Sequence, residues 1–416
     1  MVFQEIFYQI QSLVILDLLV ILLFPAIFDY SRMIGKIIFL ELKTTKHSHE
    51  KPYYMVHDCT VSILIPAHNE ESSIKQSIEA ALATSYPNKE IIVINDGSTD
   101  DTYEIAKKYI SKGVKLLYIK RGGSKADALN YGILYSTGEI IITMDADTVI
   151  EKYSIEGIVR KFDDPDVMAV SGNVRIKLGD DNIINTLTHL QKYEYQNIFD
   201  LSRQCLSILN ILLLVSGAFA AFRREAINWE GRFSKDTLCE DLDKTLQVQK
   251  MGKKIVFARE AHAYTFCPNN LQDFIRQRNR WAYGQIKNLQ KHKNVFLSSK
   301  YNTRFRLAMY DMVMMDVILN ASSIISIIIL SVIILIPIII SFDYTLFNDI
   351  VAKLAFLLLL YVIVEGIVFF YLYSRKLVGF RSIYLIPIMV FLYRPMMKVI
   401  TLRAHLSAII GRKNFW

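Results

Sequence analysis

Hydrophobic and polar positions divide the chain into three zones. Residues 10–30 are almost free of charge, residues 56–300 alternate short apolar runs with amphipathic stretches, and residues 307–402 return to long apolar runs. An apolar run of about 20 residues is long enough to cross a bilayer as a helix. We therefore expect a transmembrane anchor over 1–34, a soluble domain over 56–300, and membrane or interface helices over 301–416.

Within the middle zone the pattern switches between short strand-like runs and helical periodicity. It predicts strands over 61–65, 90–95, 114–119 and 139–143, and helices over 70–84, 99–111 and 125–136. Alternating units of this length imply an α/β fold with a mostly parallel sheet covered by helices. Apolar residues at helical spacing over 182–210 predict another helix, which either delivers substrate at an interface or simply packs.

The distribution of basic residues predicts how the chain is oriented in a membrane. The first nine residues hold no Lys or Arg, whereas five basic residues follow the first apolar stretch: Arg32, Lys36, Lys43, Lys46 and Lys51. Basic residues collect on the cytoplasmic side. We expect a multi-pass protein of the plasma membrane with its N-terminus outside and the middle domain in the cytoplasm.

The last zone predicts three further spans, over Ser322–Phe342, Val351–Ser374 and Ser382–Leu402. Three spans would place the basic end of the chain outside, so either the last segment is re-entrant or interfacial, or another crossing exists. Glu365 and Arg394 lie within these apolar segments. Charges facing lipid are unfavourable, so we expect the two to pair or to line a polar path.

Composition supports a membrane protein and argues against two other classes. Apolar residues make up 52% of the chain, and the formal net charge of +8 fits anionic lipid headgroups. Nothing in the charge distribution favours nucleic acid. The four cysteines show no C-x-x-C spacing, which is the pattern of zinc sites.

Candidate chemistry follows the ends of the predicted strands. Asn69, Asp96 and Asp145 each lie just past a strand, and ligands bind parallel sheets at this edge. Asp145 and Asp147 form an Asp-x-Asp pair whose oxygens suit Mg²⁺ or Mn²⁺. Acidic pairs at strand ends are also often turn residues or helix caps. Asp96 also begins a good turn, with Ser98 or Thr99 expected to cap the following helix.

Taken together, several motifs in fixed order resemble those of the inverting family-2 glycosyltransferases. The resemblance covers roughly residues 58–300 and rests on Val61–Glu71 (VSILIPAHNEE), Ile91–Asp100 (IIVINDGSTD), Gly122–Asn130 (GGSKADALN), Met144–Thr148 (MDADT), Ser216–Arg224 (SGAFAAFRR), Glu240-Asp241 and Gln277–Gln285 (QRNRWAYGQ). Within that family the chain is similar to the membrane synthases of poly-β-1,6-N-acetylglucosamine, hyaluronan, chitin and cellulose. The resemblance implies a GT-A-like domain inserted between transmembrane helices.

The resemblance also implies roles for individual residues. It assigns a UDP-sugar donor site to Asn69, Glu70, Asp96, Lys125, Asp127, Asp145, Gln277 and Arg280, with Asp96 at the uracil. Asp145 and Asp147 would engage a Mg²⁺ or Mn²⁺ ion and the diphosphate. Asp241 would be the general base, Glu240 would have a secondary role, and Trp281 would stack on the acceptor sugar.

The implied activity is processive transfer of a sugar, with N-acetylglucosamine favoured, onto a growing β-linked polysaccharide that is then exported. Partners would be a UDP-sugar, a polysaccharide or glycan acceptor, membrane lipid and a small accessory membrane subunit. Two alternatives stay open: a transferase that adds one sugar to a lipid or short glycan, and a non-catalytic transport or scaffold subunit. The chain departs from the family at two places. Cys239 stands where Thr is frequent, just before the implied base, and the segment 228–238 lacks the Gly-Tyr-Trp pattern, which bears on the acceptor and on the choice of sugar.

Overall fold

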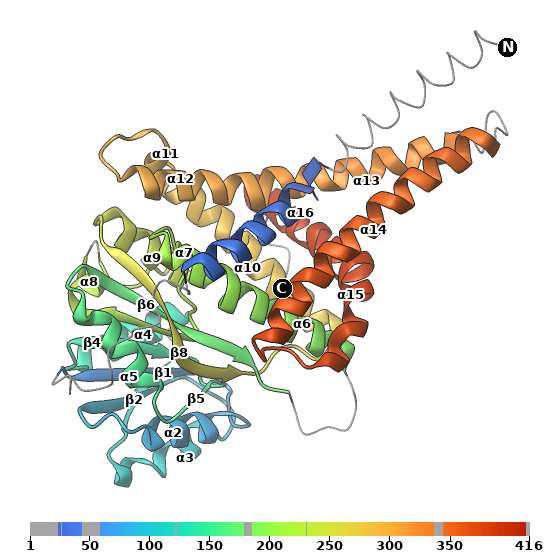
Figure 1. Cartoon of the computed structure of the whole chain (residues 1–416). Coiled ribbons are helices and arrows are strands. Elements are labelled where there is room, and N and C mark those ends of the chain that lie inside the picture. Colours follow the sequence, from blue (N-terminus) through green and yellow to red (C-terminus); the bar gives the residue numbers. More distant parts are fainter. Residues whose placement is uncertain are drawn as a thin grey trace, which may run out of the picture. The chain divides into compact units, whose positions relative to one another are not determined.

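The computed structural model describes residues 24–25, 27–43, 59–120, 123–178, 185–229, 231–336 and 344–412 (Figure 1). They divide into two compact units, one built on His47–Tyr310 and one that joins Met1–Lys46 to Asp311–Ser407. Most of the expected N-terminal anchor lies outside the described residues, and within it only residues 24–25 and those from 27 onward are seen to be helical.

The first unit contains an eight-stranded sheet with the order β3-β2-β1-β4-β7-β6-β8-β5. Its strands are β1 (Val61–Ala67), β2 (Lys89–Asp96), β3 (Lys115–Ile119), β4 (Ile140–Met144), β5 (Val149–Ile150), β6 (Val167–Ile176), β7 (Phe219–Arg223) and β8 (Lys254–Thr265). The predicted α/β class is confirmed. The strands from β3 to β4 are parallel, whereas β7 is antiparallel to both β4 and β6, so the second half of the sheet is mixed.

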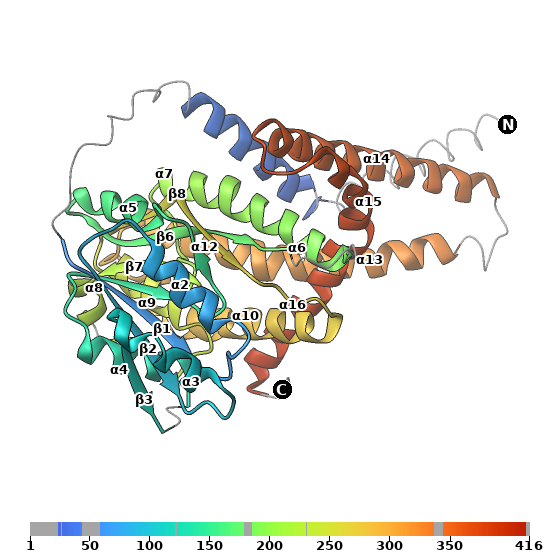
Figure 2. The same ribbon diagram turned by 90° about the horizontal axis from the view of Figure 1, so that it is seen from below.

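Helices of this unit connect and cover the strands. They are α2 (Ile74–Ala83), α3 (Thr102–Lys107), α4 (Lys125–Tyr135), α5 (Ser154–Val159), α6 (Thr186–Gln196), α7 (Gln204–Ile208), α8 (Arg224–Asn228), α9 (Glu240–Lys250), α10 (Leu271–Lys291) and α11 (Asn294–Leu297). A π-helical segment, η3 (Asn197–Arg203), joins α6 to α7. The helix predicted over 182–210 is therefore present, and its first part packs on β6 (Figure 2).

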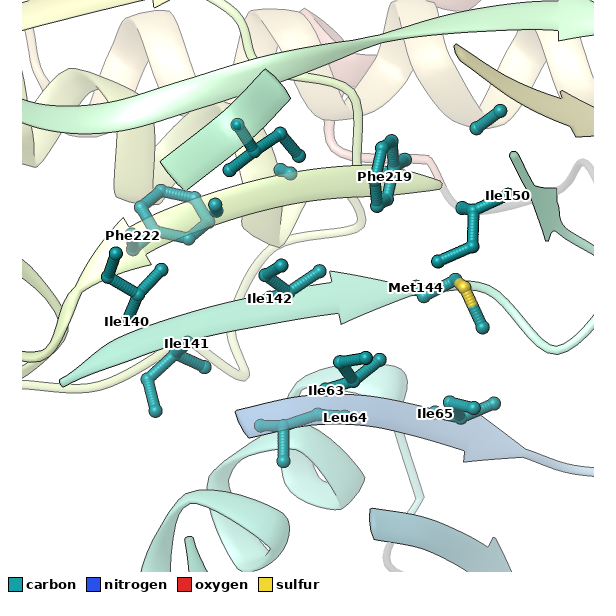
Figure 3. Packing of buried hydrophobic residues seen from close by; sticks show 14 of the residues in the cluster. Ile63, Leu64, Ile65, Ile140, Ile141, Ile142, Met144, Ile150, Phe219 and Phe222 are labelled. Atoms are coloured by element: carbon teal, nitrogen blue, oxygen red, sulfur yellow. The ribbon is translucent and has the colours of Figure 1, made fainter. Parts of the chain in front are cut away.

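The core lies where β1, β4 and β7 run side by side (Figure 3). Ile63, Ile141 and Phe219 have no exposed surface. Helix α4 approaches β1 and β2 closely because Gly132 has no side chain, and a Cβ there would lie 2.9 Å from Ile94 Cδ1. Burial of such side chains is worth about 1.5–3 kcal/mol each. The strands whose carboxyl ends carry the predicted site residues are therefore tightly packed.

Two local predictions were wrong. The first strand continues through Pro66 instead of ending there, because pairing with β4 stops at Leu64 and the missing N–H is tolerated beyond that point. Neither Ser98 nor Thr99 caps α3. The carboxylate of Asp100 accepts the N–H of Thr102 at 3.1 Å instead.

The second unit is helical and contains the apolar segments. Among the residues that the structure describes, three helices are long and apolar enough to cross a membrane: Thr303–Ile329, Val351–Ser374 and Phe380–Ile410. They are built from α12 (Thr303–Met312), η4 (Val313–Ile318), α13 (Leu319–Ile336), α14 (Tyr344–Ser374), η6 (Phe380–Tyr384), α15 (Leu385–Ile388), η7 (Met389–Tyr393) and α16 (Arg394–Ile410). The helix that was predicted to begin at Ser322 begins at Thr303, because the amphipathic stretch before Ser322 is helical as well.

The predicted pairing of Glu365 and Arg394 is confirmed. Arg394 Nη2 lies 2.7 Å from Glu365 Oε2, and Tyr30 Oη donates to the same oxygen at 2.8 Å. Glu365 is fully buried. A carboxylate in this position is tolerated because a guanidinium and a hydroxyl satisfy it.

Candidate active site

Two loops at the carboxyl edge of the parallel strands are tied together by Asn69. This residue adopts a left-handed conformation with φ of 56°. Its side-chain oxygen accepts the N–H of Thr99 at 2.8 Å, and its own N–H donates to Ser98 Oγ at 3.1 Å. His68 Nδ1 lies 2.7 Å from the carbonyl oxygen of Asp96. The predicted donor residues Asn69 and Asp96 therefore share one edge of the sheet.

Three carboxylates interact at the end of β4. Burial, and then the charges of Asp145 and Glu70, raise the pKa of Asp147 to about 6. Burial also raises the pKa of Glu70, against the hydrogen bond from Ser73, and the charge of Asp145 adds to the rise. This mutual repulsion identifies a position where a cation would be favourable.

The carboxylate oxygens at the end of β4 suit a hard divalent cation that is held partly by the phosphates of a bound substrate. Among the described residues, no three His, Cys, Asp or Glu side chains are already arranged around a metal position. Mg²⁺ is typically held by one or two carboxylates together with substrate phosphates. A cation at Asp145 and Asp147 needs both groups ionised, so its binding should tighten as pH rises through about 6.

Lys125 connects the end of β4 to the start of α9. Its Nζ contacts the carboxylate of Asp145, donates to the carbonyl oxygen of Gly217 at 3.2 Å and lies 3.6 Å from Glu240 Oε1. Burial lowers the pKa of Lys125, but Asp145 and Glu240 outweigh it and the net shift is upward. The lysine is therefore held in its charged form between the two carboxylates.

Asp241 lies in the first turn of α9 with both oxygens engaged by backbone. Gly217 N–H donates to Oδ2 at 3.0 Å, and Leu242 N–H donates to Oδ1 at 2.8 Å. A Cβ on Gly217 would lie 2.9 Å from Oδ2, so only glycine allows this approach. The helix N-terminus adds a positive partial charge beside the carboxylate. Burial raises the pKa of the neighbouring Glu240, which Lys125 opposes.

The aromatic motif on α10 is fixed by a residue within the motif itself. The guanidinium of Arg278 lies 4.6 Å from the Trp281 ring centroid, and its Nη2 donates to Glu194 Oε2 of α6 at 2.5 Å. Arg278 is only 5% exposed. Gln277 Oε1 is buried and has no protein partner among the described residues. Trp281 is partly buried against the core, so its ring is held in one orientation.

Hydrogen bonds join helix α10 to the N-terminal end of α9, which carries Asp241. Asn288 Nδ2 donates to the carbonyl oxygen of Cys239 at 2.9 Å, and His292 Nε2 lies 2.8 Å from Asp243 Oδ1. Gly284 allows Cys239 to pack against α10. Burial, with the charges of Asp241 and Glu240, raises the pKa of the Cys239 thiol. This cysteine is therefore a neutral packing group.

One predicted donor residue is engaged elsewhere. Asp127 accepts the hydroxyl of Ser124 at 2.7 Å in the first turn of α4 and pairs with Lys235. Its carboxylate is therefore occupied by partners other than the carboxylates at the end of β4. Arg280 lies in the motif on α10, where its charge acts on Cys239.

One residue that supports the site was not found by sequence reasoning. Lys244 is fully buried, and its Nζ lies within 3.4 Å of four backbone carbonyl oxygens, those of Ala226, Ile227, Trp229 and Gly231. Asn130, which belongs to the motif Gly122–Asn130, exchanges hydrogen bonds of 2.8 and 2.9 Å with the backbone of Phe233. Both residues hold the segment that precedes α9. Nothing in the pattern marked Lys244, because a lysine among the charged residues of a helix is usually exposed.

A family comparison identifies the domain that contains this edge. Residues 62–229 match the model of Glycosyl transferase family 2. This part of the chain is therefore similar to a glycosyltransferase family 2 domain. This confirms the resemblance drawn from the motifs, and the protein is a hexosyltransferase.

Relatives and a solved structure agree with this assignment. The chain is 28% identical over 292 residues to poly-β-1,6-N-acetyl-D-glucosamine synthase of Staphylococcus aureus (strain COL), with 69% of each chain covered. It is 32% identical over 232 residues to the synthase of the same name from Staphylococcus epidermidis, with 54% of each covered. A mannosyltransferase from Pyrobaculum calidifontis, solved with GDP-Man and Mn²⁺, covers 97% of this chain with a TM-score of 0.63 and 16% identity. That likeness shows a shared fold.

Proposed function

We propose that this enzyme transfers a sugar from a UDP-sugar, with inversion, onto a growing β-linked polysaccharide and exports the product. N-acetylglucosamine is the favoured sugar, in keeping with what the named relatives make. The observation that carries the proposal is the link from Asp145 through Lys125 to Glu240, beside an Asp241 carboxylate fixed by Gly217 N–H. The carboxylates proposed to bind the metal and the carboxylates at the start of α9 are thus connected through Lys125.

Each residue has a task in the proposed reaction. Asp96 and Asn69 would contact the nucleoside at the carboxyl edge, with Glu70 beside the carboxylate pair. Asp145 and Asp147 would hold Mg²⁺ or Mn²⁺, which when bound neutralises charge on the diphosphate. Lys125, Arg280 and Gln277 would contact the donor's phosphates and sugar.

Inversion requires a single displacement from the face opposite the departing diphosphate. Asp241 would take the proton from the attacking hydroxyl of the acceptor. Trp281 would stack on the acceptor sugar, since an indole ring packs well on an apolar sugar face. The three candidate spans would anchor the enzyme in the plasma membrane, with the transferase domain in the cytoplasm beside its nucleotide donor.

The test is UDP release by the purified protein in lipid nanodiscs, with a panel of UDP-sugars in Mg²⁺, Mn²⁺ or EDTA. We expect one donor to give a ladder or high-mass smear on a gel, and EDTA to remove activity. Release of UDP with one added sugar would instead show a single-addition transferase. If adding a candidate membrane partner is needed before any donor reacts, the accessory subunit is essential.

Replacing Trp281 by Ala should weaken acceptor use more than donor hydrolysis. The ring is pre-oriented by Arg278, so its stacking energy of about 1.4 kcal/mol corresponds to about a tenfold rise in acceptor KM. Donor hydrolysis without acceptor should stay close to the wild-type rate. Tyr153→Ala is the control, because that aromatic ring is 59% exposed and belongs to none of the motifs. Equal losses in both assays would make Trp281 a packing residue.

A further inference from the structure

The proposed mechanism does not use Arg203, a buried cation near the proposed base. Arg203 ends the π-helical segment η3 and is 7% exposed. Its Nη1 donates to Ser171 Oγ at 2.8 Å, and its guanidinium lies 3.8 Å from the Phe199 ring centroid. A π-helical turn within a longer helix often marks a functional position. Burial of an arginine this deep needs compensation from nearby acceptors or charge.

Hydrogen bonds lead from Arg203 toward the proposed base. Ser171 Oγ, which receives the guanidinium, also accepts the N–H of Ser216 at 3.3 Å. The next residue is Gly217, whose N–H donates to Asp241 Oδ2 at 3.0 Å. The position of the N–H that orients Asp241 is thus set from the side of Arg203.

The same loop is attached to α9 at a second point. Thr245 Oγ1 accepts the N–H of Val215 at 3.4 Å and donates to the carbonyl oxygen of Asp241 at 2.6 Å. The loop over 215–217 is therefore held between α9 on one side and β6 with Arg203 on the other. A change in Arg203 should be transmitted to Asp241 with little movement elsewhere.

Electrostatics links the two residues directly. Burial lowers the pKa of Arg203 to about 10, while the charges of Asp241 and Tyr195 oppose that shift. Asp241 in turn acts on Cys239, Glu240 and Lys125. Lys125 contacts Asp145 and lies near Glu240, so two cations, Lys125 and Arg203, interact with the carboxylates at the start of α9.

We propose that Arg203 is a positioning residue of the transfer reaction. Through Ser171 it fixes the loop whose Gly217 N–H donates to Asp241 Oδ2. The inference rests on the proposed role of Asp241 as the general base. It adds to that role a buried guanidinium that holds this loop in place.

The test compares Arg203→Gln and Arg203→Lys with the control Arg224→Gln. Arg224 donates to Gly138 O and Ser136 Oγ, at the opposite end of β4 from Asp145. We expect Arg203→Gln to lower kcat by about 10- to 100-fold, because small misplacement of a catalytic group has effects of this size. The KM for the donor should stay within about twofold of wild type.

Rescue by lysine separates positioning from packing. Lysine keeps a positive charge and a donor that can reach Ser171 Oγ, whereas glutamine is neutral. Arg203→Lys should therefore recover part of kcat, again with little change in the KM for the donor. Thermal unfolding in nanodiscs checks that all variants are folded.

Two results would overturn the inference. One is an Arg203→Gln enzyme that behaves as Arg224→Gln does. The other is a lower kcat that comes with an equally large rise in the KM for the donor and is not rescued by lysine. Failure of the underlying proposal looks different, because Asp241→Asn would then retain transfer whatever the Arg203 variants do.

Discussion

Asp241→Asn is expected to abolish sugar transfer while leaving nucleotide binding nearly unchanged. The amide keeps the shape of the side chain but cannot accept the proton of the attacking hydroxyl. A positioned general base typically contributes about 10²- to 10⁴-fold, so kcat should fall by that factor. UDP should bind with wild-type affinity by calorimetry, because Asp241 is held by Gly217 and Leu242 and not by the proposed donor residues.

Two variants make this result interpretable. Asp166→Asn is the control, since Asp166 lies on the surface and pairs with Lys253. Glu240→Gln should have a smaller effect on kcat than Asp241→Asn, because Glu240 belongs to the ion-pair group of Lys125. Near-normal turnover of Asp241→Asn would remove Asp241 from the base position. A loss in Glu240→Gln larger than that in Asp241→Asn would exchange the two roles.

The parallel half of the sheet was predictable because its signals are local. Short apolar runs with turn residues at their ends marked β1, β2 and β4, and the carboxyl-edge rule then placed Asp96 and Asp145 together. The antiparallel strand β7 gave no such signal. Its pairing with β4 joins residues about 80 positions apart, from Ile140 to Arg223, and periodicity does not report partners at that range.

The site divides in the same way. Motifs located the carboxylates and Trp281, but not the groups that hold them. Gly217 is needed because Asp241 approaches its backbone, and Arg278 orients Trp281 through a partner on α6. These contacts join segments far apart in the chain, so their necessity is visible only in three dimensions. The capping prediction failed for a related reason. Asn69 donates its N–H to Ser98 Oγ and accepts the N–H of Thr99, so both residues contact Asn69 instead of the first turn of α3.

The junction of α9 and α10 connects the helix of the proposed base, Asp241, to the helix of the proposed acceptor aromatic, Trp281. Cys239 comes just before Glu240 in the chain, and Gly284 lies one helical turn after Trp281. Packing of Cys239 on Gly284 therefore fixes the distance between the two helices that carry these groups. Asn288 reinforces the contact by its hydrogen bond to Cys239 O.

Gly284→Ala should consequently be a severe substitution. Alanine is ordinarily better than glycine in a helix by about 0.5–1 kcal/mol. Here the added Cβ would lie 2.4 Å from Cys239 Sγ, 3.1 Å from its Cβ and 3.3 Å from its backbone nitrogen. Rotation of the thiol cannot relieve the last two contacts, so overpacking of about 1–3 kcal/mol outweighs the helical gain. We expect kcat to fall by about 10- to 100-fold, because the base moves relative to the acceptor.

A double-mutant cycle tests whether this contact is the cause. Cys239→Ala alone should keep most activity, and Cys239→Ala combined with Gly284→Ala should recover part of the loss, because the 2.4 Å contact is gone. Gly366→Ala is the control for the substitution itself, since a Cβ there meets nothing within 4 Å. Additive losses in the double variant would mean that the contact between Cys239 and Gly284 is not the cause of the loss in Gly284→Ala. Recovery would show that this contact helps to hold the proposed base and the proposed acceptor aromatic in register.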